Sequence, residues 1–422
     1  MPGPLDGVRI LEFGEIIAGP YGAMLLADMG ADVIKIEPPW GEPWRFSREI
    51  SPFESRTFIS LNRGKRSLPL DLTKKEATEI THKLVSQADV VIINFRPDVP
   101  YKLRIDYETL SEINPRLIYC ENTAFGRQGP DNNRPGYDLI VQAMSGLMAS
   151  DGKIFNGAPQ QITATAVSDF STGLAIAWGV CTALYSRERT GLGQKIESTL
   201  LGSALSIQTS SFINVQMVDD EPRAEFLETL ERMRQAGSSY EDVHTLYQSY
   251  RTQPTWNSYY RTYQTKDSVI AVGCLSDTLR KKMSDALGFH DIRFDPGYVA
   301  TNPEVEAFNV ELAKTLERLF MTKTTTEWLQ ILDSAGVPSG PVRFVEELLN
   351  DPQVEANGLV VELEHDQVGP IKMAGPMLSM SETPLQAKTA SPSLGQHTDE
   401  VLEGLGYSKT TIQQLKATGV TR

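Results

Sequence analysis

Short apolar segments alternate with amphipathic segments through the first half of the chain. Amphipathic periodicity predicts helices over residues 21–29 and 73–88 and from about Asp138 onward, with Thr73 as an N-cap and Glu76 at the capping-box position. The apolar, β-branched runs between them predict buried strands at residues 8–13, 32–37, 66–72, 89–95 and 117–122. This alternation is typical of an α/β fold with a parallel, doubly wound sheet.

The pattern changes in the second half. Residues 218–253 are polar and helical in pattern, and residues 257–273 predict a β-hairpin. Further helices are expected over 310–320 and 326–335. The tail returns to short strands, at 360–365 and 369–375, and ends in a helix over 408–417.

Composition and charge narrow the class of protein. The chain has 422 residues, of which 40% are hydrophobic and 22% charged, so a globular protein with more than one core is expected. A net charge of −14 argues against nucleic acid as a partner. A local basic cluster can still bind a small anion.

The chain shows no pattern of a leader or a metal site. Its N-terminal residues lack a basic region followed by an apolar one, and the apolar stretch 174–184 is too short to cross a bilayer. We therefore expect a cytoplasmic protein without a membrane partner. Cys120, Cys181 and Cys274 are widely spaced, so buried thiols and no metal are expected.

Two loops suggest ligand chemistry. The glycine-containing loop 13–22 follows the first strand, where doubly wound sheets bind ligands, but it lacks the dinucleotide fingerprint and is also compatible with a simple tight turn. The basic residues of 62–66, with Lys74 and Lys75, are either a phosphate site or a solvated face.

Two carboxylates also have alternative interpretations. Asp169 precedes an apolar helix, so it is either an N-cap or an ionised nucleophile, and a helix N-terminus favours both. Asp138 is either the cap of the helix that it opens or part of a site. Tyr137, beside it, is either a core residue or a hydrogen-bond donor to a reacting carbonyl.

Several ordered segments resemble the class III CoA-transferases of the CaiB/BaiF type, which include formyl-CoA transferase, carnitine CoA-transferase and the α-methylacyl-CoA racemases. The matching text begins with PLDGVRILEFGEIIAGPYGAMLLADMGADVIKIEPP and continues through NRGKRSLPLDL, ADVVIINFRPDV and RPGYDLIVQAMSGLM to VSDFSTGLAIAWGVCTALYSRERTGLGQKIE and LGQHTDEVLEGLGYS. The resemblance implies a Rossmann-like large domain built from both chain ends, a smaller α+β domain and an interlocked homodimer. We expect the large domain at 1–215, the small domain with its linkers at 216–335, and the return to the large domain at 336–422.

The resemblance also implies an activity. Asp169 matches the transferases' nucleophile, which forms an aspartyl anhydride and then an aspartyl-CoA thioester while CoA moves from an acyl-CoA donor to a free carboxylic acid. Tyr137 and Asp138 match the tyrosine-acid pair beside it. No permanent cofactor is implied, because CoA and acyl-CoA are substrates. The CoA-binding positions that carry over are Ile16, Ala18, Leu72, Lys75, Asn94, Phe95, Lys102 and Leu103.

Departures from the family pattern bear on the substrate. Lys102 stands where an arginine is usual, Ile17 stands where formyl-CoA transferase has glutamine, and a run of glycines is lacking between Trp256 and Leu275. The last two differences argue against formate and oxalate. Tyr137 stands where the racemases have histidine, which disfavours racemisation. An acyl-CoA racemase or epimerase and a catalytically silent CoA-binding dimer remain the alternatives.

Overall fold

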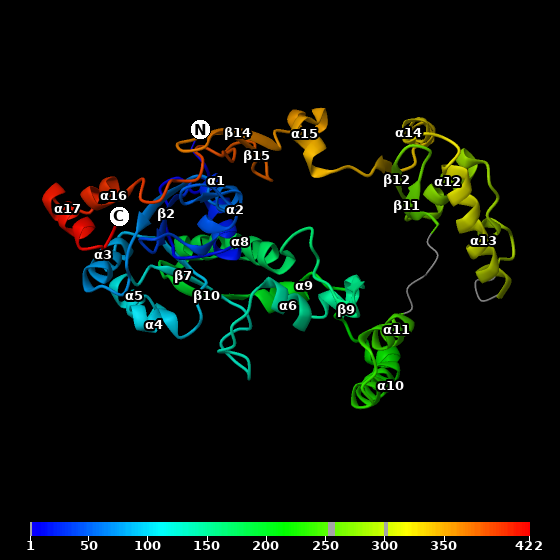
Figure 1. Cartoon of the computed structure of the whole chain (residues 1–422), viewed down its shortest axis with the longest axis horizontal. Coiled ribbons are helices and arrows are strands. Elements are labelled where there is room, and N and C mark those ends of the chain that lie inside the picture. The colour runs from blue at the N-terminus through cyan, green and yellow to red at the C-terminus, as the bar shows by residue number, and fades with distance from the viewer. Residues whose placement is uncertain (1, 252–257, 299–302) are drawn as a thin grey trace. The chain divides into compact units, whose positions relative to one another are not determined.

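The structure, a computed structural model, describes residues 2–251, 258–298 and 303–422 (Figure 1). Its contacts divide the chain into two compact units, of which the first combines Met1–His244 with Pro352–Arg422 and the second is Thr245–Asp351. The unit boundaries fall later in the chain than the expected boundaries after residues 215 and 335. Both chain ends therefore contribute to the first unit.

A six-stranded parallel sheet forms the centre of the first unit. Its strands are β1 (Arg9–Glu12), β2 (Asp32–Glu37), β5 (Lys65–Pro69), β6 (Val90–Ile93), β7 (Ile118–Thr123) and β10 (Gln194–Thr199). They lie in the order β10-β7-β6-β1-β2-β5, and every neighbouring pair is parallel. The predicted parallel sheet is confirmed, and the order reverses direction between β1 and β6.

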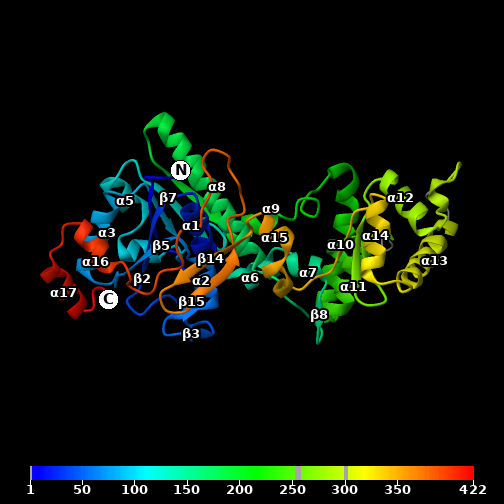
Figure 2. The ribbon, with the colours of Figure 1, turned by 90° about the horizontal axis from the view of Figure 1, so that it is seen from above.

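Helices cover both faces of this sheet. Side chains along a strand point alternately to the two faces of the sheet. In β1, Ile10 therefore belongs to the core on one face and Leu11 to the core on the other. On the Ile10 face lie α1 (Ala18–Asp28) and α8 (Val167–Thr190), side by side (Figure 1, Figure 2). The helices on the Leu11 face are α3 (Lys75–Val85), α5 (Tyr107–Ile113), α16 (Thr398–Gly404) and α17 (Lys409–Ala417).

Shorter elements surround this framework. The other helices of residues 2–251 and 352–422 are α2 (Arg56–Leu61), α4 (Val99–Leu103), α6 (Asp138–Met144), α7 (Leu147–Asp151), α9 (Leu200–Ser206), α10 (Gln216–Gln235), α11 (Tyr240–Tyr250) and α15 (Pro352–Ala356). Three small hairpins pair β3 (Glu49–Ser51) with β4 (Glu54–Ser55), β8 (Ile154–Phe155) with β9 (Ala158–Pro159), and β14 (Val360–His365) with β15 (Gly369–Ala374).

The second unit is built around a three-stranded antiparallel sheet of β11 (Tyr260–Gln264), β12 (Val269–Gly273) and β13 (Ser339–Pro341). Its helices are α12 (Asp277–Leu287), α13 (Pro303–Phe320) and α14 (Thr325–Ser334). Tyr263 stacks on Phe320 at 4.4 Å between ring centroids, which ties the sheet to α13. The predicted hairpin is confirmed from Tyr260 onward, while its expected first residue, Asn257, lies outside the described residues.

Two local expectations need correction. Thr73 does not cap α3, because the N-cap is Lys74 and the Thr73 hydroxyl donates to Asp71 at 2.6 Å. Moreover, the apolar stretch 174–184 lies inside a 24-residue helix, α8, which by length and composition could cross a membrane. One side of α8 is nevertheless buried against α1 and the sheet, as in the core helix of a globular unit.

Candidate active site

The loops after β1 and β6 meet where the strand order reverses, the place at which doubly wound sheets bind ligands. The backbone N–H of Glu15 donates to Asn94 Oδ1 at 2.9 Å, and Asn94 Nδ2 donates to the Glu15 carbonyl at 2.7 Å. This reciprocal pair holds the two loops together. The side chain of Asn94, a predicted CoA-binding residue, therefore braces the site.

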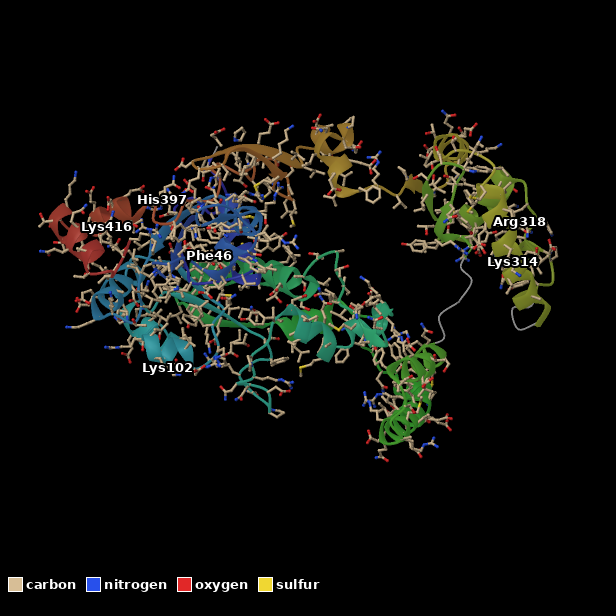
Figure 3. All side chains as sticks on the ribbon, viewed as in Figure 1. Phe46, Lys102, Lys314, Arg318, His397 and Lys416 are labelled. Carbon is tan, nitrogen blue, oxygen red and sulfur yellow. The ribbon has the colours of Figure 1, made fainter. Side chains whose placement is uncertain are left out.

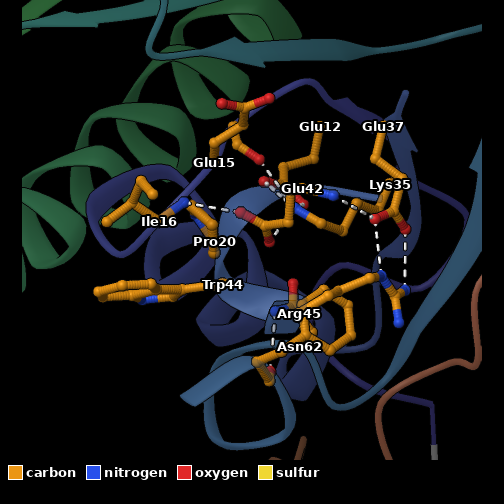
Figure 4. Close-up of polar contacts among 12 residues, drawn as sticks. Glu12, Glu15, Ile16, Pro20, Lys35, Glu37, Glu42, Trp44, Arg45 and Asn62 are labelled. Atoms are coloured by element: carbon orange, nitrogen blue, oxygen red, sulfur yellow. Dashed lines mark hydrogen bonds and ion pairs between the residues drawn. The ribbon is translucent and has the colours of Figure 1, made fainter. Parts of the chain in front are cut away.

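A buried ion network supports the first of these loops (Figure 4). Lys35 Nζ donates to the Gly14 carbonyl at 2.7 Å and lies 3.3 Å from Glu12 and 3.1 Å from Glu42. Burial alone would lower the pKa of Lys35, but Glu12 and Glu42 raise it above its usual range. Glu42 also accepts the N–H of Ile16 at 2.8 Å. Ile16 has a φ of 70°, which is rare for a β-branched residue, so this contact stabilises a strained backbone.

The basic residues of 62–66 take part in the same framework. Lys65 Nζ lies 3.1 Å from Glu12, and burial lowers the pKa of Lys65 to about 8 although Glu12 opposes the shift. Arg63 forms a buried ion pair with Asp28 at 2.7 Å. For these two residues both sequence interpretations, the phosphate site and the solvated face, are wrong. Their charges are neutralised inside the protein.

The first turn of α8 is capped by a residue from α6. The N-cap of α8 is Ala166, which has no side-chain acceptor, and Asp138 Oδ1 accepts the N–H groups of Ser168 at 2.8 Å and Asp169 at 3.4 Å. Gln142 Nε2 donates to the other Asp138 oxygen. The interpretation of Asp169 as an N-cap is therefore wrong, and so is that of Asp138 as the cap of its own helix.

The side chain of Asp169 has no such partners. Within residues 2–251, 258–298 and 303–422 no group donates a hydrogen bond to its carboxylate, and only 9% of the residue is exposed. Burial, and then the nearby charge of Asp138, raises the pKa of Asp169 to about 7. The sequence interpretation in which the helix N-terminus favours the ionised form of Asp169 is therefore wrong, because the pKa is raised and not lowered. Near pH 7 the protonated and ionised forms of Asp169 are therefore both populated.

Asp169 and Tyr137 lie in the wall of one cavity of about 280 Å³. The Tyr137 side chain is largely exposed, with 67% of the residue accessible. Gly136 fixes its position, because a Cβ at Gly136 would lie 2.6 Å from that of Ala124. Asp138 lies behind this wall as the cap of α8. The described residues lining the cavity are Glu15, Ile16, Pro43, Asn94, Phe95, Arg96, Pro97, Val99, Asn122, Thr123, Ala124, Phe125, Asn132, Arg134, Pro135, Gly136, Tyr137, Asp169 and Leu200.

A second hollow of about 450 Å³ adjoins this cavity. Leu72, Phe95 and Leu103, all predicted to bind CoA, line it, and Phe95 and Glu15 line both hollows. Burial raises the pKa of Glu15. Ala18, another predicted residue, is buried in the first turn of α1. The structure thus brings most of the predicted CoA-binding positions to one edge of the sheet.

The two predicted lysines lie on the surface. Lys75 pairs with Glu79 at 3.4 Å, and Lys102 pairs with Asp98 at 2.7 Å. Figure 3 shows Lys102 on α4. Exposed pairs of this kind contribute roughly 0–1 kcal/mol. The ammonium groups of Lys75 and Lys102 can therefore leave these carboxylates for another anion at little cost in free energy.

Comparison with known proteins decides the family. A model described as CoA-transferase family III matches residues 5–398. The chain belongs to CoA-transferase family III. The succinate–glutarate CoA-transferase of Agrobacterium fabrum is 34% identical over 410 residues, covering 95% of this chain and 96% of the relative. A formyl-CoA:oxalate CoA-transferase of Rhodopseudomonas palustris is 30% identical, covering 99% and 97%.

A solved structure agrees with this family. A CaiB/BaiF family protein from Brucella suis matches with a TM-score of 0.73 and 30% identity, over 96% of this chain and all of that chain. The resemblance inferred from the sequence is confirmed, and the protein is a CoA-transferase that uses CoA thioesters as substrates. Among the described residues, no group of three or more histidine, cysteine, aspartate or glutamate side chains is arranged to hold a metal ion.

Proposed function

We propose that this family III CoA-transferase moves CoA between two carboxylic acids with Asp169 as its covalent nucleophile. The observation that supports this is that the Asp169 carboxylate lies in a cavity wall and that no described group donates a hydrogen bond to it. Structural carboxylates in proteins are paired or hydrogen-bonded, because burying an unpaired one is costly. An unpaired one that faces a cavity is free to attack a ligand.

The proposed reaction proceeds in two halves. The Asp169 carboxylate attacks the carbonyl carbon of the acyl-CoA thioester, the carbon–sulfur bond breaks, and a mixed anhydride and CoA thiolate form. The thiolate then attacks the aspartyl carbonyl of the anhydride, which releases the donor acid and leaves an aspartyl-CoA thioester. The acceptor carboxylate reverses both steps. No proton is gained or lost overall, so Asp169 needs only to be deprotonated at the start.

The protonation of Asp169 therefore controls the first step. With a pKa of about 7, the carboxylate is ionised above neutral pH and is a better nucleophile than an ordinary aspartate. The N–H groups of Ser168 and Asp169 already donate to Asp138, so they are not available to stabilise the thioester oxyanion. Tyr137 remains our proposed donor to the reacting carbonyl, because its hydroxyl-bearing side chain lines the same cavity.

We place the acyl group in the 280 Å³ cavity and the rest of CoA along the 450 Å³ hollow beside it. The smaller cavity suits a short acyl chain, since cofactor-sized ligands occupy about 300–1,000 Å³. The residues proposed to contact CoA are Ile16, Ala18, Leu72, Lys75, Asn94, Phe95, Lys102 and Leu103. Lys75 and Lys102 would supply positive charge to its phosphates.

A second copy of the chain is also part of this proposal. The outer side of α8 exposes Leu174, Trp178 and Tyr185, and Trp178 is 74% exposed. Leu174 and Trp178 line a mainly apolar hollow of about 830 Å³, and the 20-residue helix α10 has no buried residue. Large apolar side chains that lie exposed next to one another are typical of an interface. A homodimer would cover it, and Trp178→Glu is expected to reduce the mass measured by light scattering to that of one chain.

The test of the covalent step uses matched aspartate variants. Asp169→Asn should abolish CoA transfer while acyl-CoA still binds. Asp277→Asn makes the same change in the first turn of α12, where the side chain is exposed, and should leave transfer intact. Hydroxylamine should inactivate the wild type only with acyl-CoA present and should leave an aspartyl hydroxamate at position 169, found by peptide mass spectrometry. Transfer by Asp169→Asn, or a hydroxamate elsewhere, would contradict the proposal.

A further inference from the structure

The two neighbouring hollows share three of their described lining residues, Glu15, Pro43 and Phe95. The proposed function places the acyl group in the smaller hollow and the rest of CoA in the larger one. Because the sulfur joins these two parts of an acyl-CoA, the sulfur and the pantetheine atoms next to it pass the shared residues. Of the three shared residues, Glu15 is the one whose side chain forms hydrogen bonds.

The backbone around Glu15 is fixed on both sides. The N–H and the carbonyl of Glu15 form the reciprocal pair with the Asn94 side chain. The carbonyl of the preceding glycine accepts from Lys35 at 2.7 Å, and the N–H of the following residue donates to Glu42 at 2.8 Å. The segment that carries the Glu15 side chain is therefore ordered before CoA arrives, which lowers the entropic cost of binding.

The carboxylate of Glu15 lacks a hydrogen-bond donor. None of the groups in residues 2–251, 258–298 and 303–422 donates to it, and Figure 4 shows it directed away from Lys35 and Glu42. Burial raises the pKa of Glu15 although the charge of Lys35 opposes the shift. A partly buried carboxylate without a donor is unfavourable, so a ligand that supplies an N–H gains free energy by binding there.

The other carboxylates that line the two hollows already have a use. Glu37 forms a buried ion pair with Arg45 at 2.7 Å. Asp71 accepts the hydroxyl and the N–H of the threonine two residues further along, at 2.6 and 3.2 Å. Asp169 is the proposed nucleophile. Among the described acidic residues of the two walls, Glu15 is thus the one left to accept a hydrogen bond from CoA.

We propose that Glu15 accepts a hydrogen bond from the pantetheine amide N–H nearest the sulfur and thereby orients the thioester toward Asp169. This inference rests on the proposed function, which places CoA in the larger hollow. The pantetheine arm is uncharged, and its donors are two amide N–H groups and one hydroxyl. The amide nearest the sulfur is separated from it by two carbon atoms, so it lies at the shared residues when the acyl group is beside Asp169.

The test compares CoA with an analogue in which an oxygen atom replaces the nitrogen of the amide nearest the sulfur. This ester has almost the same shape as CoA but lacks the N–H. Calorimetry gives both dissociation constants, and their ratio cancels any change that a variant causes in both. The wild type should bind the ester about 10- to 100-fold more weakly, the range for a lost hydrogen bond to a charged group. Glu15→Ala should bring the ratio close to one, and Glu15→Gln, which keeps a carbonyl acceptor, should retain part of it.

Controls assign the effect to this contact. An analogue with the ester at the other amide should give the same ratio in the wild type and in Glu15→Ala. Glu403→Ala removes an exposed carboxylate on α16, outside both hollows, and should leave every ratio unchanged. Exchange of ¹³C-succinate into succinyl-CoA should slow in Glu15→Ala through a higher KM. A lower kcat at unchanged KM would assign Glu15 to the chemical step and overturn the inference.

Failure of the inference and failure of the proposed function give different results. A wild-type ratio close to one, or a ratio that Glu15→Ala leaves unchanged, would overturn the contact of Glu15 with the amide. The hydroxamate at Asp169 would still support the proposed function in that case. Absence of the hydroxamate, with the ratios as expected, would instead contradict the covalent step and leave the contact with CoA in place.

Discussion

Replacing Asp169 by asparagine should stabilise the protein at alkaline pH while removing its activity. In the unfolded chain this carboxyl has the ordinary pKa of 3.8, whereas burial beside Asp138 raises its pKa to about 7 in the folded state. At pH values between these two pKa values, Asp169 is protonated in the folded state and ionised in the unfolded state. The free energy of unfolding therefore falls as pH rises from about 4 to about 7.

The size of the effect follows from the two pKa values. Their separation corresponds to about 4 kcal/mol of lost stability above pH 8, of which about 2 kcal/mol is already lost at pH 5. Asparagine is neutral at every pH, so the free energy of unfolding of the variant does not decrease in this way.

The assay is urea unfolding of the wild type and Asp169→Asn at pH values from 5 to 8. The stability of the variant relative to the wild type should increase by about 2 to 3 kcal/mol across this range. Asp277→Asn, at an exposed position in the first turn of another helix, should show no such increase. A difference for Asp169→Asn that does not change with pH would refute the assigned pKa and the reasoning built on it.

Three further outcomes are expected. The rate of hydroxamate formation should rise with pH to a plateau above about pH 7, and Asp138→Asn should shift its midpoint downward because one of the two causes of the raised pKa of Asp169 is removed. Gly136→Ala should slow exchange and cost about 1–3 kcal/mol in urea unfolding, since the new Cβ collides with the packed wall. Glu42→Ala should cost about 3–5 kcal/mol and raise KM for acyl-CoA, because it leaves a buried ammonium short of one partner and releases Ile16.

The sheet was predictable because its strands obey a simple rule. A strand buried on both faces is a continuous apolar run, and residues 90–93 have that pattern. The edge strand β10 has the sequence QKIEST and is only partly buried, so it shows no apolar run and was missed. The three-residue strand β13 was missed because proline and glycine make it resemble a loop.

The site was predictable in part. The resemblance singled out Asp169 and Tyr137, and the structure brings the two residues into one cavity wall, while their roles stay predictions. The supporting network was not predicted, since Glu42 shows no local pattern that distinguishes it from a surface acid. One signal was available. Lys35 stands between Ile34 and Ile36 in the strand 32–37, and a lysine at such a position requires a buried partner.

The role of Asp138 explains why the first turn of α8 contains a carboxylate without hydrogen-bond donors. An acid in the first turn of a helix normally binds the free N–H groups there, which lowers its pKa and its reactivity. In α8 those groups donate to Asp138 instead, so the helix is capped and the Asp169 carboxylate stays without donors. The same Asp138 charge raises the pKa of Asp169. The Asp138 carboxylate thus caps the helix and leaves the Asp169 carboxylate without donors. Asp138→Asn separates the two effects of Asp138, because asparagine keeps a side-chain oxygen that accepts the N–H groups but removes the negative charge.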